Sequence, residues 1–154
     1  MAGRFSDEFI IGEIIEHAVR RTVTETDNLL ITTLTMNPAS LHLDHHAAEQ
    51  TEFGRVLVNS LFTLGLVVGL SVGDTTLGTA IGNLGFEEVR FPAPVFVGDT
   101  LRARTEVLAA RSSRSRPGQG IVTFLHEGYN QDDRLVCRCR RMALLWKKTA
   151  DRGA

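Results

Sequence analysis

The chain has 154 residues and a formal net charge of −1, and 43% of its residues are hydrophobic. This length favours one domain with a sizeable core, so we expect a single domain over residues 1–154. A charge balance this close to zero favours neither a nucleic-acid partner nor an anionic membrane surface. No cationic stretch followed by an apolar run opens the sequence, so we expect no secretory signal and a cytoplasmic location.

The first half of the chain predicts one strand and then short helices. Residues 13–23 are rich in β-branched side chains and read as a strand. Thr24 and Asp27 then form a variant of the capping box, which opens a helix by satisfying free backbone N–H groups. We expect this short helix to bury its leucines, Leu29, Leu30 and Leu34.

The following segment contains the densest polar group in the chain. Asn37 precedes a proline and should therefore leave the helical conformation, so the chain turns there. Residues 41–51 predict a second short helical turn that begins at Asp44 as its N-cap. A brief extended piece follows at residues 56–58.

Residues 59–72 are apolar on nearly every side of a helix, which is typical of a membrane span or of a buried core helix. The run is too short to cross a bilayer, so we predict a central helix buried against a sheet, with no membrane partner. Gly65 and Gly69 share one helix face and allow close backbone approach. The helix begins at Asn59 or Ser60, where free N–H groups and the positive dipole end suit a developing oxyanion.

The second half of the chain predicts four long strands, over residues 77–90, 100–111, 120–130 and 135–147. One strand, short helices, a buried helix and four strands indicate an α+β fold with a sheet wrapped around a helix. Such a sheet has free edges, so we expect a homodimer or a dimer of dimers. Cys137 and Cys139 would share one strand face, where a mutual disulfide is geometrically poor, and we expect two reduced packing residues.

Four motifs, in this order and spacing, resemble those of the MaoC-like hydratases. They are Thr24 with Asp27, NPASLHLD at 37–44, FGRVLVNS at 53–60 and FPAPVFVGDTL at 91–101. MaoC-like hydratases are hot-dog proteins that act on enoyl-CoA thioesters, and the resemblance covers residues 10–147. Within the family the likeness is to the mesaconyl-CoA hydratases, or β-methylmalyl-CoA dehydratases. The resemblance implies a hot-dog fold, with an antiparallel sheet wrapped around the central helix.

The resemblance also implies roles for individual residues. His42 falls on the family's catalytic His, Asn37 on the Asp that helps it to activate water, and Ser60 on a Gly whose N–H holds the thioester carbonyl. Gly54 and Asn59 then lie in the substrate-binding set. The implied activity adds or removes water at the 2,3 position of a short enoyl-CoA, with a dicarboxylic, mesaconyl-like acyl group among the candidates. Coenzyme A is part of that substrate, and no separate cofactor is implied.

Asn37 keeps other functions open, because an amide can orient a water molecule but cannot take its proton. Either His42 is the sole base, or the protein binds acyl-CoA without hydrating it. A hot-dog thioesterase is a further alternative, but these enzymes place a carboxylate near the central helix, and residues 59–72 contain none. His42 itself has a structural alternative, a histidine bonded to a backbone carbonyl.

Two further sites follow from charged residues. Arg114 and Arg116 lie in a serine-rich turn that is either solvated or a contact for coenzyme A phosphates or for a second acyl carboxylate. His42, His45 and His46 would share a face of one helix, but no further ligand is signalled nearby, so we expect no metal.

Overall fold

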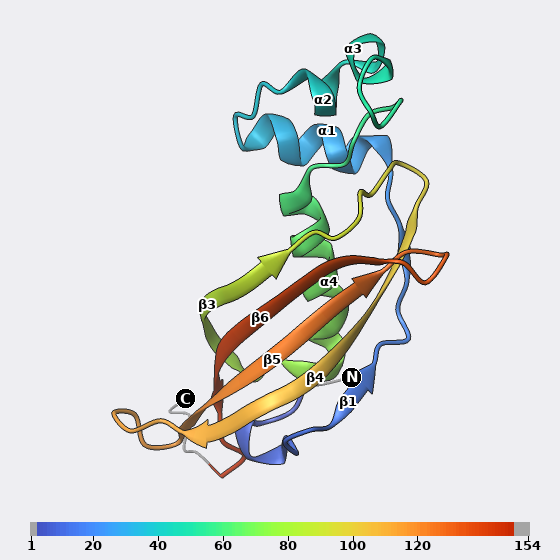
Figure 1. Ribbon diagram of the computed structural model, residues 1–154. Helices are drawn as coiled ribbons and strands as arrows, with labels where there is room; N and C mark the ends of the chain where they lie inside the picture. Colours follow the sequence, from blue (N-terminus) through green and yellow to red (C-terminus); the bar gives the residue numbers. More distant parts are fainter. Residues whose placement is uncertain (1–2, 150–154) are drawn as a thin grey trace.

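The computed structural model describes residues 3–149, in which a long antiparallel sheet curves around one central helix (Figure 1). The helical elements are the short 3-10 turn η1 (Ser6–Glu8), then α1 (Glu25–Leu34), α2 (Ser40–Leu43), α3 (His45–Glu49) and α4 (Ser60–Thr75). The strands are β1 (Ile14–Glu16), β2 (Arg21–Thr22), β3 (Ala80–Arg90), β4 (Thr100–Ser112), β5 (Gln119–Tyr129) and β6 (Leu135–Trp146). The four long strands and the central helix confirm the sequence prediction.

The sheet runs in the order β1-β4-β5-β6-β3, and β2 adds a short antiparallel pair to β4. Every one of these strand pairs is antiparallel. Alternating burial along β4 and β5 turns one face of the sheet toward α4 and the other toward solvent. β3 pairs only with β6 among the described strands, so its other edge has no partner within the chain.

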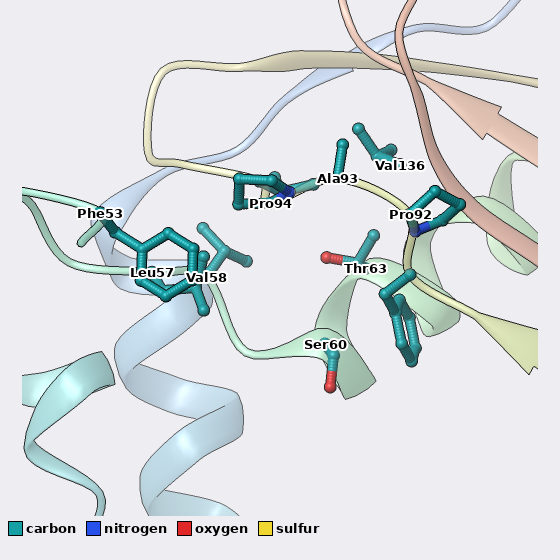
Figure 2. Close-up of a pocket in the computed structure, with 11 residues that line it drawn as sticks. Phe53, Leu57, Val58, Ser60, Thr63, Pro92, Ala93, Pro94 and Val136 are labelled. Atoms are coloured by element: carbon teal, nitrogen blue, oxygen red, sulfur yellow. The ribbon is translucent and has the colours of Figure 1, made fainter. Parts of the chain in front are cut away.

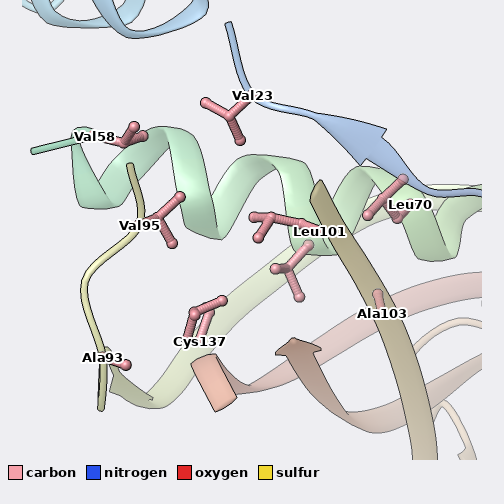
Figure 3. Packing of buried hydrophobic residues seen from close by; sticks show 10 residues of the cluster. Val23, Val58, Leu70, Ala93, Val95, Leu101, Ala103 and Cys137 are labelled. Carbon is pink, nitrogen blue, oxygen red and sulfur yellow. The ribbon is translucent and has the colours of Figure 1, made fainter. Parts of the chain in front are cut away.

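The core lies between α4 and the concave face of the sheet (Figure 3). Val67 of α4 is fully buried and packs with Leu101 of β4 and Cys137 of β6. Gly128 of β5 lies directly beneath the helix, and a Cβ at this position would overlap the Val67 side chain. The absence of a side chain at Gly128 therefore sets how closely the helix approaches the sheet.

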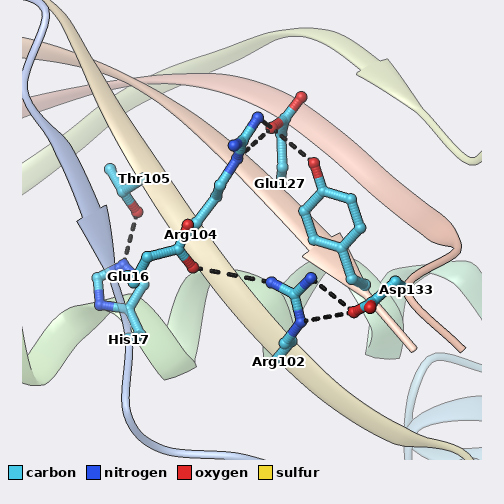
Figure 4. A network of polar contacts seen from close by, with 8 residues as sticks. Glu16, His17, Arg102, Arg104, Thr105, Glu127 and Asp133 are labelled. Carbon is cyan, nitrogen blue, oxygen red and sulfur yellow. Dashed lines mark hydrogen bonds and ion pairs between the residues drawn. The ribbon is translucent and has the colours of Figure 1, made fainter. Parts of the chain in front are cut away.

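The first predicted strand is broken in two at His17, which leaves only β1 and β2 as strands. The buried His17 ring bonds Thr105 of β4 at 2.8 Å and Asp74 of α4 at 2.8 Å (Figure 4 shows the Thr105 contact). Thr105 in turn contacts His126 at 2.8 Å. These polar groups join the edge of the sheet to the last turn of α4.

On the outer face of the sheet, long charged side chains form ion pairs across neighbouring strands (Figure 4). Arg104 pairs with Glu127 at 2.7 Å, and Arg102 pairs with Asp133 at 2.8 Å. Tyr129 lies between the two arginines and donates a hydrogen bond to Glu127 at 3.0 Å. This face is therefore polar, as expected for the solvated side of a sheet.

The expected burial of the α1 leucines is wrong. Leu29, Leu30 and Leu34 are 50%, 52% and 77% exposed, whereas Asn28 and Thr32 face inward. The helix takes this orientation because its inner neighbours are backbone groups and the Asn59 side chain, which need polar partners. Its leucines are left on an open apolar surface.

The central helix is longer than predicted and is buried on one side only. It continues to Thr75, whereas Leu61 is 55% exposed and both Gly65 and Gly69 are open. A glycine-lined face of α4 is therefore uncovered within a single chain.

Cys137 and Cys139 are buried and free, as predicted. Burial raises the pKa of the Cys137 thiol to about 12 and that of the Cys139 thiol to about 11. Both side chains therefore behave as uncharged packing groups. Within residues 3–149, no helix combines the length and the apolar character needed to cross a membrane.

Candidate active site at the start of the central helix

The start of α4 presents an unused backbone donor. Asn59 caps the helix, because its Oδ1 accepts the Leu61 N–H at 3.0 Å and its carbonyl accepts the Phe62 N–H at 3.0 Å. The Ser60 N–H has no hydrogen-bond partner among the described residues. A free N–H at the positive end of a long helix is suited to hold an oxygen that gains negative charge.

Ser60 lines a largely apolar cavity of about 310 Å³ (Figure 2). Phe53 and Leu57 come from the segment that precedes α4, and Thr63 comes from its first turn. The opposite wall is the segment that follows β3, residues 91–95, together with Val136. An apolar chamber next to a polar helix end is a common form of ligand site.

His42 lies in α2 and is tied to the segment that leads into α4. Its Nδ1 contacts the carbonyl oxygen of Leu57 at 2.7 Å. A carbonyl oxygen only accepts, so Nδ1 carries the proton and donates it, which leaves the lone pair on Nε2. This is the bond that the structural alternative for His42 required, and it also prepares Nε2 to act as a base. No partner for Nε2 is found in the part of the chain that the structure describes.

His42 lines a second cavity, of about 210 Å³, on the α1 side of this segment. The cavity is shared with Glu25, Leu29 and His45, and the Glu25 carboxylate contacts Nε2 of His45 at 2.6 Å. Ser60 and His42 therefore face two different cavities, which are separated by the segment that contains Leu57.

Asn28 joins the elements that carry these residues, and none of the sequence motifs includes it. Its Oδ1 accepts the Asn59 N–H at 2.8 Å, and its Nδ2 donates to the His42 carbonyl at 3.0 Å. The Asn59 side chain also donates to Thr32 at 3.2 Å. One signal was available, because an Asn in mid-helix is unfavourable unless its amide has a specific partner.

Asn37 adopts the turn chemistry expected before a proline. Its Oδ1 accepts the Ala39 N–H at 3.0 Å, which leaves its NH₂ group to act on a ligand. Asn37 and His42 lie close in sequence around the start of α2. The amide can thus donate to a water oxygen, whereas it has no group that takes a proton.

The other predicted binding residues fall in two places. Gly54 adopts a φ of 66° in the loop between α3 and α4, next to Phe53 of the larger cavity. Arg114 and Arg116 lie in the β4–β5 hairpin, at the end of the sheet opposite to the start of α4 (Figure 1). Within one chain, the structure does not bring these arginines to Ser60 or His42.

The three histidines are also separated. Asp44 ends α2 and caps α3 by accepting the Ala47 N–H at 3.0 Å, so His42 lies on one short helix and His45 and His46 lie on the next. Among residues 3–149, no group of three or more His, Cys, Asp or Glu side chains is placed to hold a metal ion.

Two curated proteins are similar to this chain over almost its whole length. The chain is 34% identical to the β-methylmalyl-CoA dehydratase of Chloroflexus aurantiacus over 147 residues, which cover 95% of the chain and 41% of the relative. It is 35% identical to the mesaconyl-CoA hydratase of Cereibacter sphaeroides over 153 residues, which cover 96% of the chain and 42% of the relative. The chain thus spans about two fifths of the length of these curated relatives.

The fold is that of the hot-dog proteins. A Mycobacterium tuberculosis protein described as having a double hotdog fold superposes with a TM-score of 0.85 at 24% identity, covering 99% of this chain and 47% of that one. Residues 7–129 match the family described as the MaoC-like domain. The chain, with its central helix and the motifs that precede it, belongs to the MaoC-like family.

Proposed function

We propose that this protein is a hydratase or dehydratase that adds or removes water at the 2,3 position of a short, mesaconyl-like enoyl-CoA. The observation that carries the proposal is the hydrogen bond from His42 Nδ1 to the Leu57 carbonyl, 2.7 Å long. It fixes the imidazole in the tautomer whose Nε2 accepts a proton. It also fastens that base to the segment that leads into Ser60, the residue with the unused backbone donor.

In the hydration direction, His42 Nε2 takes a proton from water while the water oxygen forms a bond to C3. The electron pair of the double bond moves through C2 onto the thioester oxygen. The proposal requires one bound thioester to reach both cavities past Leu57, with C3 next to His42 and the thioester oxygen at Ser60. The Ser60 N–H and the dipole of α4 then stabilise that charge more strongly in the transition state than in the ground state. The imidazolium then returns the proton to C2, so a 3-hydroxyacyl thioester forms and the base is regenerated.

Asn37 positions the attacking water in this mechanism. Its Oδ1 is occupied by the Ala39 N–H, so its NH₂ donates to the water oxygen and directs a lone pair toward C3. His42 is then the proton carrier of the motif, because Asp44 is used as the N-cap of α3. The names of the two curated relatives, a dehydratase and a hydratase of CoA thioesters, support this class of reaction.

A protein that binds acyl-CoA without hydrating it is the second candidate, and Asn37 favours it because the residue has no basic group. A thioesterase has less support, because residues 59–72 contain no carboxylate and Asp74 is engaged by His17 at 2.8 Å.

The test is loss of the enoyl-thioester absorbance when the protein is mixed with crotonyl-CoA or mesaconyl-CoA. His42→Ala should lower turnover by about 100-fold or more, the usual range for a positioned acid–base group. His46→Ala is the matched control, because His46 is exposed on α3 and lies outside the site. Full activity in His42→Ala would refute the mechanism, and acyl-CoA binding without turnover would establish the second candidate.

We further propose that the protein acts as a homodimer. The free edge of β3, the open face of α4 around Gly65 and Gly69, and the exposed leucines of α1 are surfaces that a second copy would cover. The relative with a double hotdog fold is about twice as long as the matched chain, which suits a pair of such units. Sedimentation at micromolar concentration should give a dimer or a dimer of dimers, and a clean monomer would contradict this proposal.

A cytoplasmic location is likewise proposed, and it is supported by the unpaired thiols of Cys137 and Cys139.

A further inference from the structure

Arg55 lies beside the His42 cavity and is not part of the mechanism above. It lines a cavity of about 200 Å³ together with Glu25, His45, Val56 and Val97. Glu25, His45 and Val56 also line the cavity that contains His42. The two cavities therefore adjoin, and a ligand next to His42 can extend toward Arg55.

The Arg55 guanidinium is held in place but is not neutralised. Its Cζ lies 3.7 Å above the centre of the Phe96 ring, and Phe96 is itself packed against Phe53 with ring centres 6.5 Å apart. Among the described residues, no carboxylate lies within ion-pair distance of Arg55. The acidic residue that lines its cavity, Glu25, contacts His45 at 2.6 Å.

Stacking leaves the binding edge of the guanidinium available. The aromatic ring occupies one flat face of the group, whereas its N–H donors point outward in the plane. Two of those donors match the two oxygens of a carboxylate in a bidentate pair. A stacked and unpaired arginine at the edge of a substrate cavity is therefore prepared to bind an anion.

We propose that Arg55 binds the second carboxylate of a dicarboxylic acyl group and so makes the site selective for mesaconyl-like thioesters. The proposal rests on the function proposed above. It gives Arg55 a role for which Arg114 and Arg116 were also candidates, and within one chain those two residues lie at the opposite end of the sheet (Figure 1).

The anion at Arg55 has two chemical sources, the acyl carboxylate and the phosphates of coenzyme A. The position of Arg55 favours the carboxylate. In a dicarboxylic acyl thioester the second carboxylate is separated from the reacting carbons by only a few bonds, and the Arg55 cavity adjoins the one with the proposed base. The phosphates lie beyond the long pantetheine arm, so a cation next to the base is badly placed to meet them.

The experiment compares Arg55→Gln with the wild type on two substrates that share coenzyme A and differ in the second carboxylate. For mesaconyl-CoA, kcat/KM should fall by about 10- to 100-fold, the range for a lost hydrogen-bonded charge pair. For crotonyl-CoA, which lacks that carboxylate, it should change by less than about twofold. Arg55→Lys keeps the charge but not the planar fork, so it should recover only part of the loss. Arg20→Gln is the control, since Arg20 is exposed and lies outside both cavities.

Each other outcome overturns one part of the reasoning. An equal loss on both substrates would place Arg55 at the phosphates, and no loss on either would make it a solvated side chain. If the wild type turns over neither thioester, the proposed hydratase function fails. Calorimetry of the binding of the two thioesters then still tests Arg55, because Arg55→Gln should weaken the binding of mesaconyl-CoA and leave that of crotonyl-CoA unchanged. Urea unfolding of each variant shows whether the stacked loop remains folded.

Discussion

Replacement of Asn28 by alanine should destabilise the protein and disable the candidate site together. The side chain is 2% exposed and makes two hydrogen bonds to backbone groups, one at 2.8 Å from the buried Asn59 N–H and one at 3.0 Å to the part-buried His42 carbonyl. Each lost bond costs about 1 kcal/mol, and each backbone group left without a partner adds a desolvation penalty. We therefore expect the free energy of unfolding to fall by about 2–4 kcal/mol.

Urea unfolding followed by circular dichroism measures this change. Asn28→Asp keeps the acceptor for Asn59 but sets a buried carboxylate oxygen against the His42 carbonyl, so it should destabilise the protein at least as much as alanine. Gln50→Ala is the control, because this amide is exposed and its side chain makes no hydrogen bond among the described residues. If Asn28→Ala unfolds within about 0.5 kcal/mol of the wild type, the amide does not fasten these elements together.

Three further predictions concern the core and the motif. Gly128→Ala should lower the free energy of unfolding by about 1–3 kcal/mol, because the added Cβ overlaps the Val67 side chain. Adding Val67→Ala should relieve part of this cost. Equal unfolding midpoints for the wild type and Gly128→Ala would contradict the packing described. Burial lowers the pKa of His126 to about 3, and the charge of Arg141 is the next cause. Below about pH 6.5 the unfolded chain therefore binds a proton at this histidine, whereas the native state does not. Stability should then fall by up to about 1.4 kcal/mol per pH unit on acidification from about pH 6.5 to about pH 5, and this slope should be smaller in His126→Asn. Asn37→Asp should support or improve turnover. It should also move the acid limb of the pH–rate profile to higher pH, because a nearby negative charge favours the imidazolium form of His42. An acid limb that does not move would place residue 37 away from His42.

The sheet and the central helix were predictable because their signals are local. Alternation along β4 and the continuous apolar run of α4 determine these elements within a few residues. The orientation of α1 was not predictable in this way. Its leucines suggested one buried face, but the groups that it meets are the Asn59 backbone and the His42 carbonyl, which only the folded chain brings to it.

The site shows the same division between local and non-local information. The capping roles of Thr24 and Asp44, the turn at Asn37 and the start of α4 near Asn59 follow from neighbouring residues, and the structure confirms them. The stacking of Arg55 on Phe96 depends on two segments far apart in the chain. For the same reason the sequence could not show that the turn with Arg114 and Arg116 lies at the opposite end of the sheet.

The two ends of the segment that carries His42 are fastened to one short stretch of chain. Val23, just before α1, and Val58, just before α4, belong to the same core cluster. Val23 exchanges backbone hydrogen bonds with residues 98–99, and Val58 donates one to Val95. Residues 24–57 thus form an insert whose two ends are fixed at Val23 and Val58. The corresponding insert of a related chain could be grafted between the same two positions. Specificity can then change by replacing one insert, provided that the new insert again supplies partners for Asn59 and Phe96.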